Sequence, residues 1–483
     1  MFLIVLLILL EMLTFLILSD IIILLFMSGG CEMAKSYQVD MTKGPMLKKI
    51  IFFTIPVMLT GILQLLYNAA DVVVVGKFAG DSSLAAVGST SSLINLIVNV
   101  FMGLSLGTGV IVAQSIGAKN KNRLTKTVHT AMLLSIISGI FVGIIGFTLA
   151  NPLLKLMGSP DDIIDKAALY TRIYFLGLPG FMVYNFGAAI LRSAGDTKRP
   201  LFILSLSGIA NVGLNLIFVI CFEMDVVGVA LATIISQYIS AVWIVVILIR
   251  ENADYRLFIN KLRIHKKELL QIIFYGMPMG IQGACFSISN VIIQSSVNSF
   301  GTLVIAGNSA AVNIEGFVHQ VSCSFAQAAI TFSGQNTGAG DYKRVRRALI
   351  LCSGLAFVFG LVTGFIVLIL KTPLLSIYTD NPDVVAAGGI RMGIMCIFYW
   401  LCGIMDVTAS TSRGMGKSIV PMIITLFFVC ITRIIWIFTV FKIFNTTESI
   451  YWSYPITWTL AIIGQLVYFT FVYKSKMKKV DKV

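Results

Sequence analysis

Long apolar stretches alternate with short polar ones along almost the whole chain. A helix needs about 20 mainly apolar residues to cross the hydrocarbon core of a bilayer, and stretches of this length recur throughout the sequence. Because backbone N–H and C=O groups must be paired inside a bilayer, each stretch is expected to be an α-helix. The pattern predicts an all-α polytopic membrane protein with twelve transmembrane helices. They are expected near residues 50–76, 84–116, 128–150, 167–191, 200–222, 226–249, 269–299, 303–334, 348–370, 385–411, 419–443 and 451–473.

The hydrophobic N-terminal extension, residues 1–32, stands apart from these spans. It is almost wholly apolar, and no Lys or Arg precedes Lys35. A secretory signal peptide begins with a basic region, so the extension does not fit that class. Two interpretations stay open. Either residues 1–32 form an extra hydrophobic helix, or the natural start is Met33 and the extension is a mis-assigned start.

Special and polar residues reveal an internal duplication. The segment Gln114–Lys126 (QSIGAKNKNRLTK) recurs downstream as Gln335–Arg347 (QNTGAGDYKRVRR). The same offset carries Arg192, Gly195 and Pro200 onto Arg413, Gly416 and Pro421. Six spans per half is an even number, so both halves enter the membrane in the same sense. The chain is therefore predicted to form two six-helix lobes related by a parallel internal repeat, which places a transported substrate between them.

The charged segment between the sixth and seventh spans divides these halves. Its sequence, ENADYRLFINKLRIHKKE, is amphipathic and lacks a long apolar run. We expect an N-terminal six-helix lobe at 33–250, a cytoplasmic linker at 251–268, and a C-terminal six-helix lobe with a basic tail at 269–483.

Composition agrees with the membrane assignment. Hydrophobic residues make up 57% of the chain and charged residues 12%, and the mean hydropathy is +0.92. Soluble domains contain about 25% charged residues, so a soluble protein is excluded. The pI of about 9.4 does not indicate nucleic-acid binding, because the basic residues lie in short loops between spans. The eight cysteines show no disulfide or metal-site spacing and are interpreted as core residues.

The distribution of positive charge predicts the orientation. Cytoplasmic loops of membrane proteins are enriched in Lys and Arg. If the first span starts in the cytoplasm, most of the 36 Lys and Arg residues lie inside. Outside segments then contain only Lys77, Lys155, Lys166, Lys371 and Lys442. A multi-pass protein of the cell membrane with both termini cytoplasmic is expected.

Three carboxylates lie within predicted spans, namely Asp71, Glu315 and Asp406. A charged side chain at the centre of a bilayer costs about 2.5–3.5 kcal/mol on insertion scales, so such residues indicate function. Asp71 follows Asn68 by three residues, which places both on one helical face. Asp71 is a candidate for taking up and releasing a proton or binding a cation. The alternative is a carboxylate satisfied structurally by hydroxyls and amides.

The other two carboxylates have polar neighbours one helical turn away. Asp406 lies in the inner half of the tenth span and precedes Ser410. Glu315 and His319 are four residues apart on one face of the eighth span. That pair could bind a cation or exchange a proton, or it could be a structural hydrogen-bonded pair. Glu-x3-His alone is a weak metal signal, and no metal site is predicted.

Amides and arginines complete the set of polar residues within the spans. Asn211 and Asn215 lie one turn apart in the fifth span, where they could assist a carboxylate, coordinate a cation or join helices. Arg172 and Arg391 lie near outer ends, which favours snorkelling of the side chain toward water. Arg433, nearer the membrane centre, has no evident role.

Several of these residues together resemble the multidrug and toxic compound extrusion (MATE) family of bacterial transporters, in particular its clostridial-type members. The resemblance rests on Pro56, Asn68, Asp71 and Gly76 in the first span, the turn Gln114-x2-Gly117-Ala118 with its copy Gln335-Asn336-x-Gly338-Ala339, and the run LRSAGDTKRP at 191–200. It covers the chain from about Met33 to the C-terminus.

The resemblance implies functions for particular residues. The family's first-span cation-coupling aspartate falls on Asp71, and its tenth-span aspartate falls on Asp406. Many proton-coupled relatives have Asn-x3-Asp in the fifth span, whereas this chain has Asn215 as the second residue. The seventh-span glutamate of some sodium-coupled members falls on Phe286. Asp71 would then act with amide partners, or Glu315 would supply the second charge. Residues expected to support coupling or substrate binding are Asn68, Asn185, Asn211, Asn215 and His319.

The resemblance implies a secondary active multidrug efflux transporter working by alternating access. It would export cationic amphiphilic compounds in antiport with H⁺ or Na⁺, with no cofactor beyond that ion. The expected partners are substrates and membrane lipids, without nucleic acid, and the expected state is a monomer. An alternative is a flippase for lipid-linked saccharides, a related fold that lines its cavity with several arginines. An enzyme is not expected, because the three histidines form no HExxH motif.

Overall fold

The computed structural model of this protein describes residues 39–156 and 163–480. All regular structure within these ranges is helical, as predicted. The hydrophobic N-terminal extension lies outside the described residues.

The first half contains six membrane segments. They are α2 (Met46–Phe78), α3 (Asp81–Gly117), α4 (Lys121–Leu156), α5 (Ile164–Leu176) with α6 (Leu178–Ser193), α7 (Lys198–Leu216) with the π-helix η1 (Ile217–Cys221), and α8 (Asp225–Arg250). A 3₁₀ turn, η2 (Ile259–Lys261), lies in the connection to the second half.

The second half repeats this arrangement. Its elements are α9 (Lys266–Asn298), α10 (Thr302–Gly338), α11 (Tyr342–Ile369), the short α12 (Lys371–Ser376), α13 (Pro382–Gly414), then α14 (Ile419–Thr425), the π-helix η3 (Leu426–Ile431), α15 (Thr432–Phe438) and α16 (Val440–Phe444), and finally α17 (Thr447–Val480).

The count of membrane segments agrees with the prediction of twelve. Among the described residues, ten helical segments are long and apolar enough to cross a membrane, and the bent pair α5–α6 forms an eleventh. The twelfth is α10, which has 37 residues but carries polar side chains such as Asn308 and Glu315 along its length. These side chains lower its hydropathy because they are polar, and they are tolerated because both residues are buried in the bundle interior.

The fourth segment bends by 46° between α5 and α6. Pro179 lacks a backbone N–H and therefore cannot continue the hydrogen-bond ladder to Phe175. At Gly177 an added Cβ would lie 2.5 Å from Gln237 Oε1, so α8 packs directly against the bend. The bend therefore lies directly against the polar side chain of Gln237.

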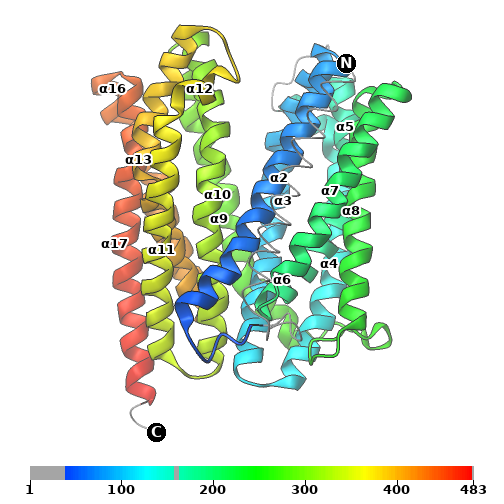
Figure 1. Cartoon of the computed structure of the whole chain (residues 1–483), viewed down its shortest axis with the longest axis vertical. Helices are drawn as coiled ribbons and strands as arrows, with labels where there is room; N and C mark the ends of the chain where they lie inside the picture. Colours follow the sequence, from blue (N-terminus) through cyan, green and yellow to red (C-terminus); the bar gives the residue numbers. More distant parts are fainter. Residues whose placement is uncertain (1–38, 157–162, 481–483) are drawn as a thin grey trace.

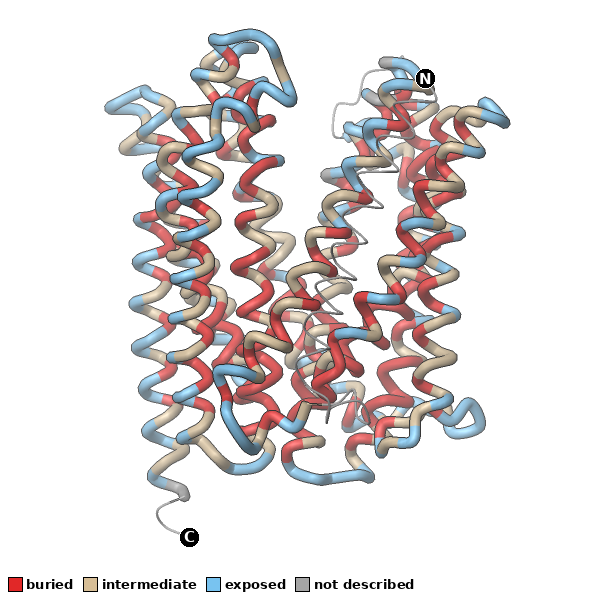
Figure 2. Tube along the Cα trace, viewed as in Figure 1, coloured by how far each residue is buried: buried red, intermediate tan, exposed pale blue. Residues whose placement is uncertain are grey.

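Two helical lobes make up the molecule, one containing α2–α8 and the other α9–α17 (Figure 1). Buried residues concentrate where helices face one another, and exposed positions follow their outer faces (Figure 2). Large apolar side chains on those outer faces are well exposed, for example Phe141 at 56%, Ile144 at 60% and Val467 at 66%. Apolar exposure on this scale indicates that the outer faces contact lipid.

The duplicated motif forms a contact between the lobes at the end where the basic loops lie, here called the basic end. Gln114 Nε2 donates to the Gly414 carbonyl at 2.9 Å, and Gln335 Nε2 donates to the Ser193 carbonyl at 2.8 Å. Each glutamine therefore reaches across to the opposite lobe. We call the contact formed by Gln114, Gly117, Gln335 and Gly338 the basic-end seal.

Close backbone approach explains the two glycines of this seal. An added Cβ at Gly117 would lie 1.8 Å from the Gln335 carbonyl oxygen, and one at Gly338 would lie 2.1 Å from the Gln114 carbonyl oxygen. No side chain fits at such distances, so the repeat needs glycine at both positions. From the seal the lobes diverge toward the opposite end (Figure 1).

Candidate functional site

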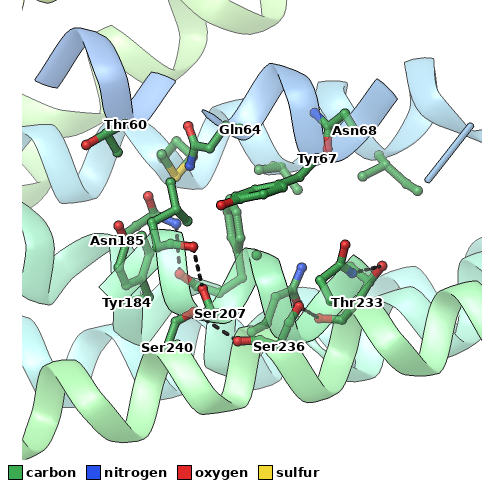
Figure 3. Close-up of a pocket in the computed structure, with 18 of the residues that line it drawn as sticks. Thr60, Gln64, Tyr67, Asn68, Tyr184, Asn185, Ser207, Thr233, Ser236 and Ser240 are labelled. Atoms are coloured by element: carbon green, nitrogen blue, oxygen red, sulfur yellow. Dashed lines mark hydrogen bonds between the residues drawn. The ribbon is translucent and has the colours of Figure 1, made fainter. Parts of the chain in front are cut away.

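A polar cavity of about 500 Å³ lies in the first lobe, with Gln327 of α10 as the one lining residue from the second lobe among those described. Side chains of α2, including Thr60, Gln64 and Asn68, line one side of it and face residues of α6, α7 and α8 (Figure 3). Asp71 also lines this cavity and is the only carboxylate among its described lining residues. The sequence-predicted residues Asn68, Asp71, Asn185 and Asn211 therefore come together at one place.

Packing of α2 on α7 sets the position of Asp71. The Tyr67 ring covers Gly208, where an added Cβ would lie 1.8 Å from the ring, and the Tyr67 hydroxyl donates to the Ser205 carbonyl at 3.2 Å. Asp71 follows Tyr67 by one turn of α2, and Asn215 follows Gly208 by two turns of α7. The next pair along this interface is accordingly Asp71 and Asn215.

Asn215 is the direct partner of Asp71. Its Nδ2 donates to Asp71 Oδ1 at 2.5 Å and also lies 3.4 Å from Asn211 Oδ1. Asn211 Nδ2 in turn donates to the Thr233 hydroxyl of α8 at 3.4 Å. Asn215 thus gives Asp71 one nitrogen donor from α7, and Asn211 links this pair to Thr233 of α8.

Two acceptor oxygens in this region lack a protein partner. Asn215 Oδ1 and Gln237 Oε1 are buried and accept no hydrogen bond among the described residues. A buried acceptor without a donor is costly, so such atoms favour binding of a cation or a donor from outside the protein. The carboxylate of Asp71 supplies the negative charge that a cation requires.

The other two predicted residues of this lobe, Asn68 and Asn185, line the cavity without a described hydrogen bond to Asp71. Asn68 is exposed to the cavity and forms no hydrogen bond with Asp71 among the described contacts. Asn185 is buried, and its Nδ2 donates to the Phe181 carbonyl of its own helix at 2.8 Å. The amide oxygen and the second N–H of Asn185 take no part in this intrahelical bond.

Sequence reasoning missed several residues of the cavity. Tyr170 and Tyr174 of α5 and Thr233 and Gln237 of α8 all line it. Gln237 could have been selected from the sequence, because a glutamine within an apolar span is as unusual as Asn211 and Asn215. The two tyrosines and the threonine could not have been selected from the sequence, since these residue types are common in membrane helices.

Glu315 lies in the second lobe and forms a buried ion pair with Arg391. Arg391 Nε donates to Glu315 Oε1 at 3.0 Å, and Arg391 Nη2 donates to Oε2 at 2.9 Å. Asn308 Oδ1 accepts from Arg391 Nη1 at 2.9 Å. The snorkelling expected for Arg391 is wrong, because α13 turns the side chain inward and leaves the residue 6% exposed.

His319 does not share the partners of Glu315. Its Nε2 lies 3.4 Å from the Cys323 sulfur, one turn along α10. Asp406 lies beside it rather than in the cavity of the first lobe, and accepts a weak hydrogen bond from the Cys402 thiol at 4.0 Å. The structure thus separates the predicted residues into the Asp71 cavity in one lobe and two clusters in the other.

Arg433 also has a defined environment. Its Nε donates to the Thr457 hydroxyl at 3.0 Å, and its guanidinium lies 4.0 Å from the centre of the Tyr454 ring. The residue is 4% exposed. These contacts compensate the charge in part, and Arg433 Nη2 stays buried without a hydrogen-bond partner among the described residues.

Twelve membrane segments in two repeated lobes, with a carboxylate-containing cavity inside one lobe, define a polytopic membrane protein of the transporter class. A model of the MatE family matches residues 56–217 and 278–439, one segment in each half. The chain therefore belongs to the MATE family of multidrug and toxic compound extrusion transporters.

Relatives with curated names support this assignment. The probable multidrug resistance protein YoeA of Bacillus subtilis is 24% identical over 440 residues, which cover 89% of this chain and 94% of that protein. The probable multidrug resistance protein NorM of Thermotoga maritima is 25% identical over 407 residues, or 82% of this chain and 86% of that protein.

Solved structures show the same fold. An outward-facing multidrug resistance MATE family transporter of the MOP superfamily superposes with a TM-score of 0.86 at 22% identity, covering 92% of this chain and 99% of that chain. A MOP superfamily transporter from Pyrococcus furiosus gives a TM-score of 0.85 at 22% identity, covering 90% and 98%.

Proposed function

We propose that this protein is a secondary active multidrug efflux transporter that exports cationic amphiphilic compounds in exchange for H⁺ or Na⁺. The observation that supports this proposal best is the pairing of Asp71 with Asn215 at the wall of the cavity. Membership of the MATE family and the names of the curated relatives support the multidrug part.

The chemistry of the cavity suits an organic cation. Sites for small molecules typically have volumes of about 300–1,000 Å³, and the cavity of about 500 Å³ lies in that range. Tyr170 and Tyr174 offer aromatic faces, which attract cations, and Asp71 offers the compensating charge. The described lining contains one arginine, Arg192, so it does not support the flippase alternative.

Competition for Asp71 provides the coupling. When ionised, this carboxylate attracts either an organic cation or Na⁺, and when protonated it loses that attraction. Binding of the inorganic ion therefore favours release of the drug, and binding of the drug favours release of the ion. Either ion can fill the role, because Asp71 accepts a proton and Asn215 Oδ1 adds a free oxygen ligand for Na⁺.

We place the protein in the cell membrane with the basic end in the cytoplasm, following the distribution of Lys and Arg. The lobes touch at the basic end and diverge toward the other (Figure 1), an arrangement that suits an outward-facing state. Release of substrate to the exterior would occur from this state, and the protein would act as a monomer.

The test is gradient-driven transport by Asp71→Asn. Asparagine preserves the shape and most hydrogen bonds of aspartate but removes its charge. In liposomes with an imposed pH or Na⁺ gradient, this variant should lose efflux of a cationic dye while remaining folded. The matched control is Asp383→Asn, since Asp383 is exposed at the start of α13, far from the cavity residues in sequence and lobe. Near-normal gradient-driven transport by Asp71→Asn would overturn the proposal.

A further inference from the structure

Two helices of the second lobe carry metal-ligating side chains one turn apart. His319 and Cys323 lie on α10, and Cys402 and Asp406 lie on α13. Residues four apart on a helix share a face, so each helix presents a pair of donors. The helices pack closely here, because an added Cβ at Gly403 would lie 3.2 Å from Ser322. The two pairs of donors therefore face each other across this contact.

Distances between the donor atoms suit one small ion. Atoms of His319, Cys402 and Asp406 all lie within 4.8 Å of one another. Cys323 Sγ lies 3.4 Å from His319 Nε2, and Cys402 Sγ lies 4.0 Å from Asp406 Oδ2. Two donors bound tetrahedrally at about 2.0–2.3 Å from Zn²⁺ are separated by roughly 3.4–3.8 Å. Cys323 lies beside His319 but outside this group of three, so its sulfur must move toward the ion to become the fourth ligand.

The negative charge of Asp406 favours binding of a cation beside it. Among the described residues, this carboxylate forms no salt bridge, and its one hydrogen-bond partner is the weak thiol donor of Cys402. Glu315, on the same pair of helices, is neutralised by Arg391. A carboxylate within a membrane bundle needs a comparable partner. The cationic groups that face Asp406 are His319, within 4.8 Å, and Arg413, two turns along α13, and neither forms a salt bridge with it among the described residues.

We propose that His319, Cys323, Cys402 and Asp406 form a Zn²⁺ site inside the second lobe. One imidazole nitrogen, two thiolate sulfurs and one carboxylate oxygen form the donor set of a tetrahedral zinc site, whereas Na⁺, Mg²⁺ and Ca²⁺ prefer oxygen alone. Both cysteines bind as thiolates and His319 as neutral imidazole, so the protons that these groups carry before binding pass to the solvent. The ion joins α10 to α13 and compensates the charge of Asp406.

Direct metal analysis tests this site on the purified full-length protein. After chelator treatment, equilibration with Zn²⁺ and removal of free metal, the wild type should retain about one zinc per chain. Cys323→Ala/Cys402→Ala should retain none above background. Each variant must elute as a single species by gel filtration. Cys221→Ala is the matched control, because Cys221 is an exposed cysteine in the other lobe, and it should keep the wild-type stoichiometry.

Spectroscopy with Co²⁺ identifies the ligands. Co²⁺ replaces Zn²⁺ in tetrahedral thiolate sites and gives a sulfur-to-metal charge-transfer band, which the wild type should show and the double cysteine variant should lack. Asp406→Asn keeps both thiols and should weaken binding by more than about 100-fold, since losing even a supporting residue costs 10–100-fold. Equal zinc retention by the wild type and the double cysteine variant would overturn the proposal, as would unchanged affinity in Asp406→Asn.

Discussion

Amides, rather than a second carboxylate, accompany Asp71 in this chain. Asn215 of α7 donates its Nδ2 hydrogen directly to Asp71 Oδ1. A hydrogen bond to a charged group contributes about 1.5–3 kcal/mol, which corresponds to roughly 10- to 100-fold in affinity. Asn215→Ala should therefore reduce gradient-driven efflux by about tenfold or more. Dye transport at matched protein levels measures this effect.

The control for Asn215→Ala is Asn313→Ala. Asn313 is an exposed asparagine of α10 whose Nδ2 donates only to the Ser309 carbonyl of its own helix. It should transport at the normal rate. Equal activity of Asn215→Ala and Asn313→Ala would show that the amide beside Asp71 has no part in coupling.

The buried ion pair of Glu315 and Arg391 is expected to stabilise the folded protein. Removing one partner of a buried pair leaves an uncompensated charge and typically destabilises a protein by about 3–5 kcal/mol. Glu315→Gln and Arg391→Met should each lower the thermal stability of the purified protein, and the double variant should recover much of the loss. Unchanged stability of Glu315→Gln, combined with loss of transport, would instead assign this carboxylate a coupling role.

Sequence reasoning identified the polar residues of the spans better than their partners. Asp71, Asn211 and Asn215 could be selected because each is rare in hydrocarbon. Their meeting across α2 and α7 depends on Tyr67 covering Gly208, a contact between distant segments that no local pattern encodes. The prediction for Arg391 was wrong for the same reason. Its position near the end of a predicted span does not reveal the direction in which α13 turns its side chain.

Helices as whole elements were more predictable, because span length and apolarity are local properties. The twelve segments agree with the expected ranges, although the helices extend one or two turns into the loops. The bend between α5 and α6 was not predicted, since Gly177 and Pro179 permit a bend without fixing its angle. The short helix α12 was missed because Lys371 and Pro373 resemble a loop in sequence.

The two glycines of the basic-end seal are expected to keep α3 and α10 in contact at that end. Gly117→Ala/Gly338→Ala places methyl groups against backbone carbonyls, so the lobes should separate at the basic end. Spin labels on Asn122→Cys and Lys343→Cys, at exposed positions of α4 and α11, report this separation as a longer inter-label distance. The control is Gly354→Ala, where an added Cβ meets no atom within 4 Å. Identical distance distributions in the two backgrounds would contradict the role of the seal.

The orientation of the whole molecule follows from its charges and can be measured directly. A cysteine replacing Asp383, before α13, should react with an impermeant reagent added outside cells. A cysteine replacing Lys343, at the basic end, should react only after the membrane is permeabilised. Both positions are exposed, and in chains whose exposed native Cys221 is replaced by Ala the accessibility to the reagent reports the side of the membrane. The reverse pattern would overturn the assignment of the basic end to the cytoplasm.

Coupled exchange through Asp71 is the central claim for the whole molecule. Binding linkage is reciprocal, so a drug gradient must drive the ion as surely as an ion gradient drives the drug. The decisive measurement imposes a gradient of cationic dye across liposomes and follows internal pH and internal Na⁺ with separate indicators. The account predicts that dye movement drives one of these ions in the opposite direction with the wild type and neither with Asp71→Asn. Dye transport by the wild type without counter-movement of either ion would contradict it.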